Sequence, residues 1–191
     1  MSSEKEWVLS LLDRLRAGMQ DISQEGGTVR VESGYRLSYL HEILAYSADG
    51  RESTRSTGYE TDILVSDVMS NGSWIPRVVV ECKTWGVTTH DALTYSNKAA
   101  THKNVHPYLR YGILVGNFGD ALPARLVRHG AHFDFMMVWG SDAGTPREWQ
   151  ELLDLLKDEV ASSRKLQQVL TDRTWGKRKY RLLHRPLRLF E

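Results

Sequence analysis

The segment Arg77-Val-Val-Val-Glu-Cys-Lys-Thr-Trp85 limits the fold more than any other part of the chain. Three consecutive valines are typical of a buried strand, yet Glu81 and Lys83 are charged. Side chains alternate along a strand, so Glu81 and Lys83 share one face while Cys82 points to the other. The pattern predicts a strand that is anchored by its valines and opens towards a functional site at its charged end.

The preceding segment, residues 59–65, has the β-branched content of a strand and is followed by a polar turn, which predicts a hairpin between the two segments. Within it, Glu60 and Asp62 share a face. If the hairpin aligns these faces, Asp62 meets Glu81 at a sheet edge with Lys83 beside them. Two carboxylates about 4 Å apart repel by roughly 4 kcal/mol at an effective dielectric constant of about 20, so such a pair needs a cation.

A site of carboxylates and water suits a hard cation, which predicts Mg²⁺ as the cofactor, with Mn²⁺ as a substitute. Such an ion polarises a phosphodiester and lowers the pKa of a bound water. A neighbouring lysine stabilises negative charge or helps to deprotonate that water. The predicted reaction is phosphodiester hydrolysis.

The other elements are predicted from hydrophobic periodicity and turn residues. Helices are expected over residues 4–17, 35–48, 88–104, 122–129 and 145–162. Strands are expected near residues 28–31, 111–116 and 133–139, and a polar loop over 51–58. With the hairpin, this order predicts an α/β fold in which helices flank a mixed central β-sheet.

Length and composition limit the class of protein. The 191-residue chain is 41% hydrophobic, which is enough for one domain with a core. Its single cysteine excludes an intramolecular disulfide and a cysteine-based zinc cluster. No run approaches the roughly 20 apolar residues that span a bilayer, and the N-terminus lacks the pattern of a signal peptide. We therefore expect a cytoplasmic protein without a membrane partner.

Charge is distributed unevenly along the chain. Residues 1–160 contain 16 Lys and Arg against 22 Asp and Glu, whereas residues 161–191 contain 9 against 2. The expected division is a domain over 1–160 and a basic C-terminal segment over 161–191. The cations Lys177, Arg178 and Lys179 lie in a stretch that also contains aromatic residues, which indicates nucleic-acid binding. The alternative is a segment whose leucines dock on the body or on a second subunit.

Asp62, then eighteen intervening residues, then Glu81-Cys-Lys83 resembles the motif of the PD-(D/E)XK nuclease superfamily. The resemblance covers residues 37–140 and implies a restriction-endonuclease-like core, with residues 1–36 as an N-terminal helical segment. It implies that Asp62 and Glu81 bind the metal and that Lys83 assists the attacking water. Thr61 stands where the superfamily name has proline.

The resemblance also implies a glutamate on a preceding helix that completes the catalytic set, and Glu42 is the candidate. Glu60 and Asp67 compete for an acidic role. Glu60 shares the parity of Asp62, whereas Asp67 has the opposite parity and lies near the turn, so it ranks last.

The helix after the Glu-x-Lys strand offers further contacts with DNA. The candidates are Lys98 and Lys103, with Asn97 and His102 on the same helix. His102 and His106 have a spacing that could hold zinc, but Pro107 and the lack of a third ligand nearby disfavour it.

The leading hypothesis is a Mg²⁺-dependent DNA endonuclease with a restriction or other defence role. One alternative is a nucleic-acid-binding module on the same fold without catalysis. Another is a nuclease subunit that needs a partner to choose its target. A homodimer is kept as an alternative to a monomer.

Overall fold

The computed structural model describes residues 3–23, 27–119 and 121–172. Within these ranges the fold is α/β, as predicted, with a five-stranded sheet in the order β1-β4-β5-β6-β7. The strands are β1 (Gly27–Glu32), β4 (Ile63–Met69), β5 (Trp74–Thr84), β6 (Arg110–Gly116) and β7 (Phe135–Val138). β1, β4 and β5 pair antiparallel, while β5, β6 and β7 pair parallel, so the sheet is mixed.

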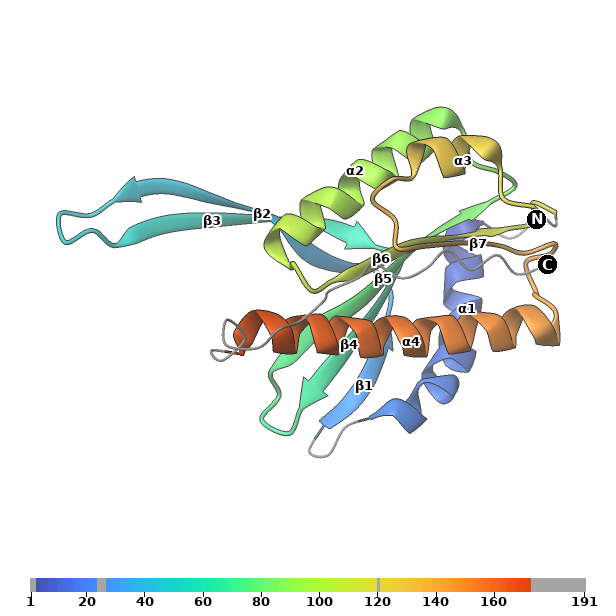
Figure 1. The fold of residues 1–191 in the computed structure, drawn as a ribbon, viewed down its shortest axis with the longest axis horizontal. Helices are drawn as coiled ribbons and strands as arrows, with labels where there is room; N and C mark the ends of the chain where they lie inside the picture. Colours follow the sequence, from blue (N-terminus) through green and yellow to red (C-terminus); the bar gives the residue numbers. More distant parts are fainter. Residues whose placement is uncertain (1–2, 24–26, 120, 173–191) are drawn as a thin grey trace.

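Helices cover both faces of this sheet (Figure 1). They are α1 (Glu4–Gly18), α2 (Thr89–Val105), α3 (Ala124–His129) and α4 (Pro146–Thr171), with a short 3₁₀ turn, η1 (Gln20–Ile22), after α1. The buried residues of α1 and α4 pack against one face, and those of α2 and α3 against the other. In the described part of the chain, no helix is long and apolar enough to cross a membrane.

The three valines of β5 explain why this strand lies at the centre. Val78 and Val80 join the cluster formed with α1 and α4, whereas Val79 joins the cluster on the α2 face. All three are at most 1% exposed. A strand that is covered on both faces has a continuous apolar sequence, and the three valines of β5 are such a sequence.

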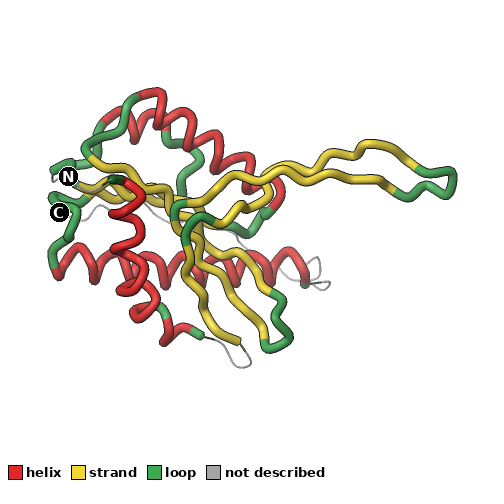
Figure 2. Tube along the Cα trace, turned by 180° about the vertical axis from the view of Figure 1, so that it is seen from behind, coloured by secondary structure: helices red, strands yellow, loops and turns green. Residues whose placement is uncertain are grey.

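A second sheet consists of the two antiparallel strands β2 (Tyr35–Tyr46) and β3 (Glu52–Thr61). They form a long ribbon that projects from the body, and we call it the arm (Figures 1 and 2). The prediction of a helix over 35–48 is therefore wrong, and so is the loop over 51–58. Asp49-Gly50, which directly follows the predicted helix, belongs to the hairpin turn, where Gly50 has a φ of 81°.

The arm is attached at its root and exposed along its outer part. Leu37 is 2% exposed and packs under α2, but every residue from 40 to 56 except Glu42 is exposed. Among the exposed side chains, Ile43, Leu44 and Tyr46 are 49%, 59% and 65% exposed. Two register shifts interrupt the pairing, between Ser38/Leu40 and Ile43/Ala45.

The remaining elements follow the predictions, with two differences. The strand predicted over residues 59–65 is divided at Asp62 between β3 and β4, which belong to different sheets. The second difference is at the C-terminal side. α4 begins at the Thr145 capping box and runs to Thr171, past the predicted end at 162. The expected boundary at residue 160 lies inside this helix. Lys177, Arg178 and Lys179 lie outside the described residues.

Candidate functional site

The candidate site lies where β5 extends beyond β4. The last pair between these strands is Ile63↔Val80, and the following residues of β5 pair only with β6. Asp62 stands at the junction of β3 and β4, opposite Glu81 in this register. Its Oδ2 accepts a 2.8 Å hydrogen bond from the backbone N–H of Cys82, which replaces the missing partner strand. The structure thus brings Asp62 and Glu81 to one open edge.

Glu81 is buried, and its Oε1 accepts two hydrogen bonds. Lys98 of α2 donates one at 2.8 Å, and the hydroxyl of Tyr111 on β6 donates the other. Glu81 is 1% exposed, so this ion pair is largely removed from solvent. Lys98 also donates to the backbone oxygen of Glu60 at 3.0 Å. Lys98 therefore neutralises Glu81 within the site, and its predicted contact with DNA stays a prediction.

The electrostatics of Asp62 reflect this crowding of negative charge. Burial, followed by the nearby charge of Glu81, raises the pKa of Asp62 to about 6, although the Cys82 N–H and Lys98 act in the other direction. Glu4 adds a smaller contribution of the same sign as Glu81. Ionisation of Asp62 is therefore less favourable in the folded protein than in water.

Lys83 is held as a cation beside this pair. Its Nζ donates to Glu4 Oε1 at 2.9 Å and lies 5.1 Å from the centre of the Tyr95 ring. Burial alone would lower the pKa of Lys83, but the interactions with Tyr95 and Glu4 raise it above its ordinary value. A lysine with a raised pKa stays protonated near neutral pH. Lys83 is therefore suited to stabilise an anion rather than to accept a proton.

The glutamate beside Lys83 is Glu4, not Glu42. Glu42 lies on β2 in the exposed part of the arm, where it forms a 3.3 Å ion pair with Arg55. Its assignment to a helix near the site is wrong because residues 35–46 form a strand. Glu4 is the first residue of α1, after the Ser3 cap. The capping box marks this helix start, but no local pattern shows that residue 4 reaches residue 83.

The other two acidic candidates, Glu60 and Asp67, do not join Asp62 and Glu81 at the site. The side chain of Glu60 is exposed, and only its backbone oxygen contacts Lys98. Asp67 is buried between Arg77 and Arg164, at 2.6 Å from each. Burial acts to raise the pKa of Asp67, but these two guanidinium groups outweigh it and lower the pKa. Asp67 is thus part of a structural ion network.

The other candidates on α2 tie elements together. Lys103 pairs with Asp134 at 2.8 Å, so its charge is already neutralised. His102 and His106 each approach the carbonyl oxygen of Ser38, at 3.2 and 3.1 Å. Burial lowers the pKa of His102 to about 4, so it is neutral. Both imidazoles thus anchor the root of the arm.

Cys82 faces the core, on the opposite side of β5 from Glu81. It is 0% exposed, and burial raises the pKa of its thiol well above the ordinary value. A buried thiol with a raised pKa is not a nucleophile.

The donor set of the pair fits a hard divalent cation. Over residues 3–23, 27–119 and 121–172 there is no group of three or more His, Cys, Asp or Glu that could hold a metal ion. Two carboxylates with water and substrate phosphate are nevertheless a usual set for Mg²⁺. In the same ranges, Asp62 Oδ1 and Glu81 Oε2 accept no hydrogen bond. A cation shared by them would relieve the repulsion that raises the pKa of Asp62.

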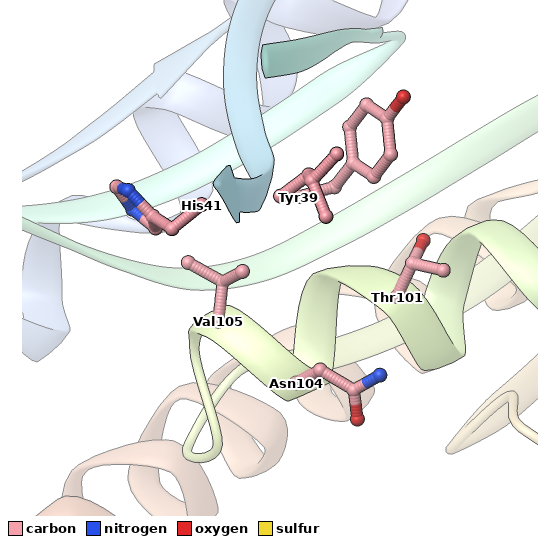
Figure 3. A pocket seen from close by; sticks show the side chains of 6 residues that line it. Tyr39, His41, Thr101, Asn104 and Val105 are labelled. Carbon is pink, nitrogen blue, oxygen red and sulfur yellow. The ribbon is translucent and has the colours of Figure 1, made fainter. Parts of the chain in front are cut away.

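A pocket of about 510 Å³ lies at the root of the arm, between β2 and α2. Figure 3 shows Tyr39 and His41 on one side and Thr101, Asn104 and Val105 on the other. Tyr39 stacks on Tyr59 with ring centres 3.9 Å apart. None of the predicted catalytic residues lines this pocket, so the carboxylate pair lies at a sheet edge outside it.

Comparison with known proteins gives no assignment: no model of a protein family matches the chain, and no curated protein matches it significantly. The motif and its geometry are therefore the basis for the function.

Proposed function

We propose that this protein is a Mg²⁺-dependent DNA endonuclease of the PD-(D/E)XK type, acting in the cytoplasm in restriction or another defence role. The observation that carries the proposal is the meeting of Asp62 and Glu81 at the open edge of β5, with the cation of Lys83 beside them. This is the minimal arrangement for hydrolysis of a phosphodiester: oxygen ligands for a metal, and a positive charge for the phosphate.

Each residue has a distinct role in this proposal. Asp62 and Glu81 would hold the metal, which when bound supplies a Lewis acid and a more acidic water. Lys83, kept protonated by Glu4 and Tyr95, stabilises the charge that develops on the scissile phosphate. Lys98 and Tyr111 fix the orientation of the Glu81 carboxylate. Glu4 is a positioning residue, since it acts through Lys83.

The alternative function is nucleic-acid binding without catalysis. One observation favours it: Lys98 forms an ion pair with Glu81, and Lys83 forms one with Glu4. Lysines of the chain therefore already neutralise Glu81 and Glu4 without a metal ion. Such a module would bind DNA without a metal, and binding would weaken steeply with salt. A nuclease subunit that needs a partner would bind the metal but cut only with that partner.

The test is cleavage of supercoiled plasmid with Mg²⁺ or Mn²⁺ and with EDTA. The wild type should cut in either metal, while Asp62→Asn and Lys83→Ala should each lose at least about 100-fold in rate, as expected for loss of a main electrostatic contact. Glu42→Gln, which changes a half-exposed carboxylate on the arm, is the matched control and should cut like wild type. Equal cleavage by wild type and both site variants would exclude the proposal. Metal-independent DNA binding without cleavage would favour the alternative.

A further inference from the structure

Trp85 has an unusual backbone conformation and an exposed side chain. It follows β5 directly, two residues after Lys83, and has a φ of 66°. Its side chain is 57% exposed. A large aromatic residue in the left-handed region is a true outlier, because its Cβ is crowded there.

The surrounding structure holds Trp85 in this conformation. Its backbone N–H donates to the oxygen of Gly116 at 3.0 Å, so the pairing of β5 with β6 continues to this residue. Gly86 follows with a φ of 133°, and a Cβ there would lie 3.3 Å from the Phe118 ring. Thr88 then caps α2. The loop between β5 and α2 is thus fixed at both ends.

Packing does not account for a tryptophan here. Asn117 has a similar φ of 53° at the end of β6, but asparagine tolerates this region, and its Oδ1 accepts the N–H of Asp142 at 2.9 Å. The indole of Trp85 is mostly in solvent. Within the described residues, the hydrogen bond of Trp85 is made by its backbone N–H, and its indole N–H donates none. Strained positions that surrounding structure maintains are concentrated at ligand sites.

The place of Trp85 indicates the ligand. It lies where the parallel strands β5 and β6 end, which is the edge where ligands bind in open α/β sheets. Two residues span at most about 7 Å, so the ring is within a nucleotide's reach of Lys83. Exposed aromatic rings stack on unpaired bases, whose faces are free, whereas bases in a duplex already stack on each other.

We propose that Trp85 is a stacking platform for an unpaired base next to the phosphate at Lys83, so that the substrate is single-stranded DNA or DNA with unpaired nucleotides. This inference rests on the proposed function for the identity of the ligand. The strain at Trp85 is maintained because the ring must project at this point of the loop.

The test measures binding in EDTA, so that it does not depend on cleavage. A fluorescent single-stranded oligonucleotide and the matched duplex are titrated with wild type, Trp85→Asn and Trp85→Phe. Trp85→Asn should weaken single-strand binding about 10-fold or more, given the usual contribution of one stacked base, and leave duplex binding within about 2-fold. Trp85→Phe keeps a ring and should retain most of the affinity.

Thermal unfolding separates this role from a structural one. Because asparagine tolerates a positive φ, Trp85→Asn should raise the melting temperature by about 2–4 °C, whereas Trp85→Phe should leave it unchanged. Tyr46→Asn removes an exposed ring from the arm and should change neither kind of binding.

Unchanged single-strand affinity in Trp85→Asn, an equal loss for duplex, or no single-strand binding by wild type would overturn this inference. Cleavage that does not depend on Trp85 would support the proposed nuclease function and contradict the stacking role of Trp85. Stacking-dependent binding by a protein that never cuts would instead remove only the nuclease proposal.

Discussion

Asp62 lies in an environment unlike that of an ordinary surface acid. It is half-buried beside Glu81, and its pKa of about 6 reflects the cost of ionising it there. Strand parity placed Glu81 and Lys83 on one face of a strand. The position of Asp62 opposite Glu81 also depends on the register shift in the pairing of β4 with β5, which no local pattern predicts. Glu4 and Lys98 were not predicted in their roles, since both reach the site only through tertiary packing of α1 and α2.

The first prediction concerns the stability of Asp62→Asn. The pKa of Asp62 in the folded protein, about 6, is above its ordinary value of 3.8. Between these values the folded state binds more protons than the unfolded state, so this residue's contribution to stability falls as pH rises from about 4 to 6. In EDTA at pH 7.5, Asp62→Asn should therefore be more stable than wild type, by on the order of 2 kcal/mol.

The measurement is denaturant unfolding at pH 7.5 and at pH 4, where the difference between the two proteins should vanish. Added Mg²⁺ should stabilise only the wild type, because the variant lacks one ligand. An Asp62→Asn protein that is less stable than wild type in EDTA would contradict the strain inferred at this carboxylate.

The second prediction concerns Glu4→Gln. Removing this carboxylate takes away one of the interactions that raise the pKa of Lys83, so that pKa should fall towards its ordinary value. The alkaline limb of the kcat/KM profile should move to lower pH, while the rate near pH 7 falls less than in Lys83→Ala. Glu42→Gln is again the control, and an unshifted alkaline limb would show that Glu4 does not act through Lys83.

At the scale of elements, buried ion pairs join strands to helices. Asp67 on β4 contacts Arg77 on β5 and Arg164 on α4, and Arg77 is 3% exposed. Most helices and strands were predictable because capping boxes and apolar runs are local features. The arm was not predictable in this way. Two register shifts interrupt the alternation of side chains along β2, and Leu37, Leu40 and Leu44 therefore have the spacing that is typical of a helix.

The third prediction concerns this ion network. Asp67→Ala should destabilise the protein by about 3–5 kcal/mol, because it leaves buried Arg77 without its counter-charge. The pKa of Asp67 is below its ordinary value, so its contribution to stability is fully present above that value and is lost as pH falls through the lowered pKa. Denaturant unfolding at pH 7 measures the loss. Asp13→Ala, which breaks an exposed pair with Arg16, should cost less than about 1 kcal/mol.

At the scale of the whole molecule, the protein consists of a layered body and the arm. The body has covered sheet faces and contains the site, whereas the outer arm contributes exposed leucine, isoleucine and tyrosine side chains. A two-stranded ribbon alone is only marginally stable in water. The arm therefore depends on its root, where Leu37, His102 and His106 hold it against the body.

The fourth prediction follows from this division. Replacing residues 43–54 by Asn-Gly closes the hairpin at the regular pair Glu42↔Arg55 with a two-residue turn. The shortened protein should unfold within about 2 °C of the wild type, since the removed residues lie outside the core clusters. Thermal unfolding followed by circular dichroism measures this, and a loss of several degrees would show that the outer arm stabilises the body.

The attachment of the arm has a mechanical consequence. Thr61, the last residue of β3, is fully buried and donates a hydrogen bond to the backbone oxygen of Tyr35 at 3.0 Å, and the next residue is Asp62. The twelve residues of β2 extend to about 40 Å, so the arm is long. Its base lies one residue from Asp62, a proposed metal ligand. A displacement of the arm at Thr61 would therefore also move Asp62, because the two residues are adjacent in the chain.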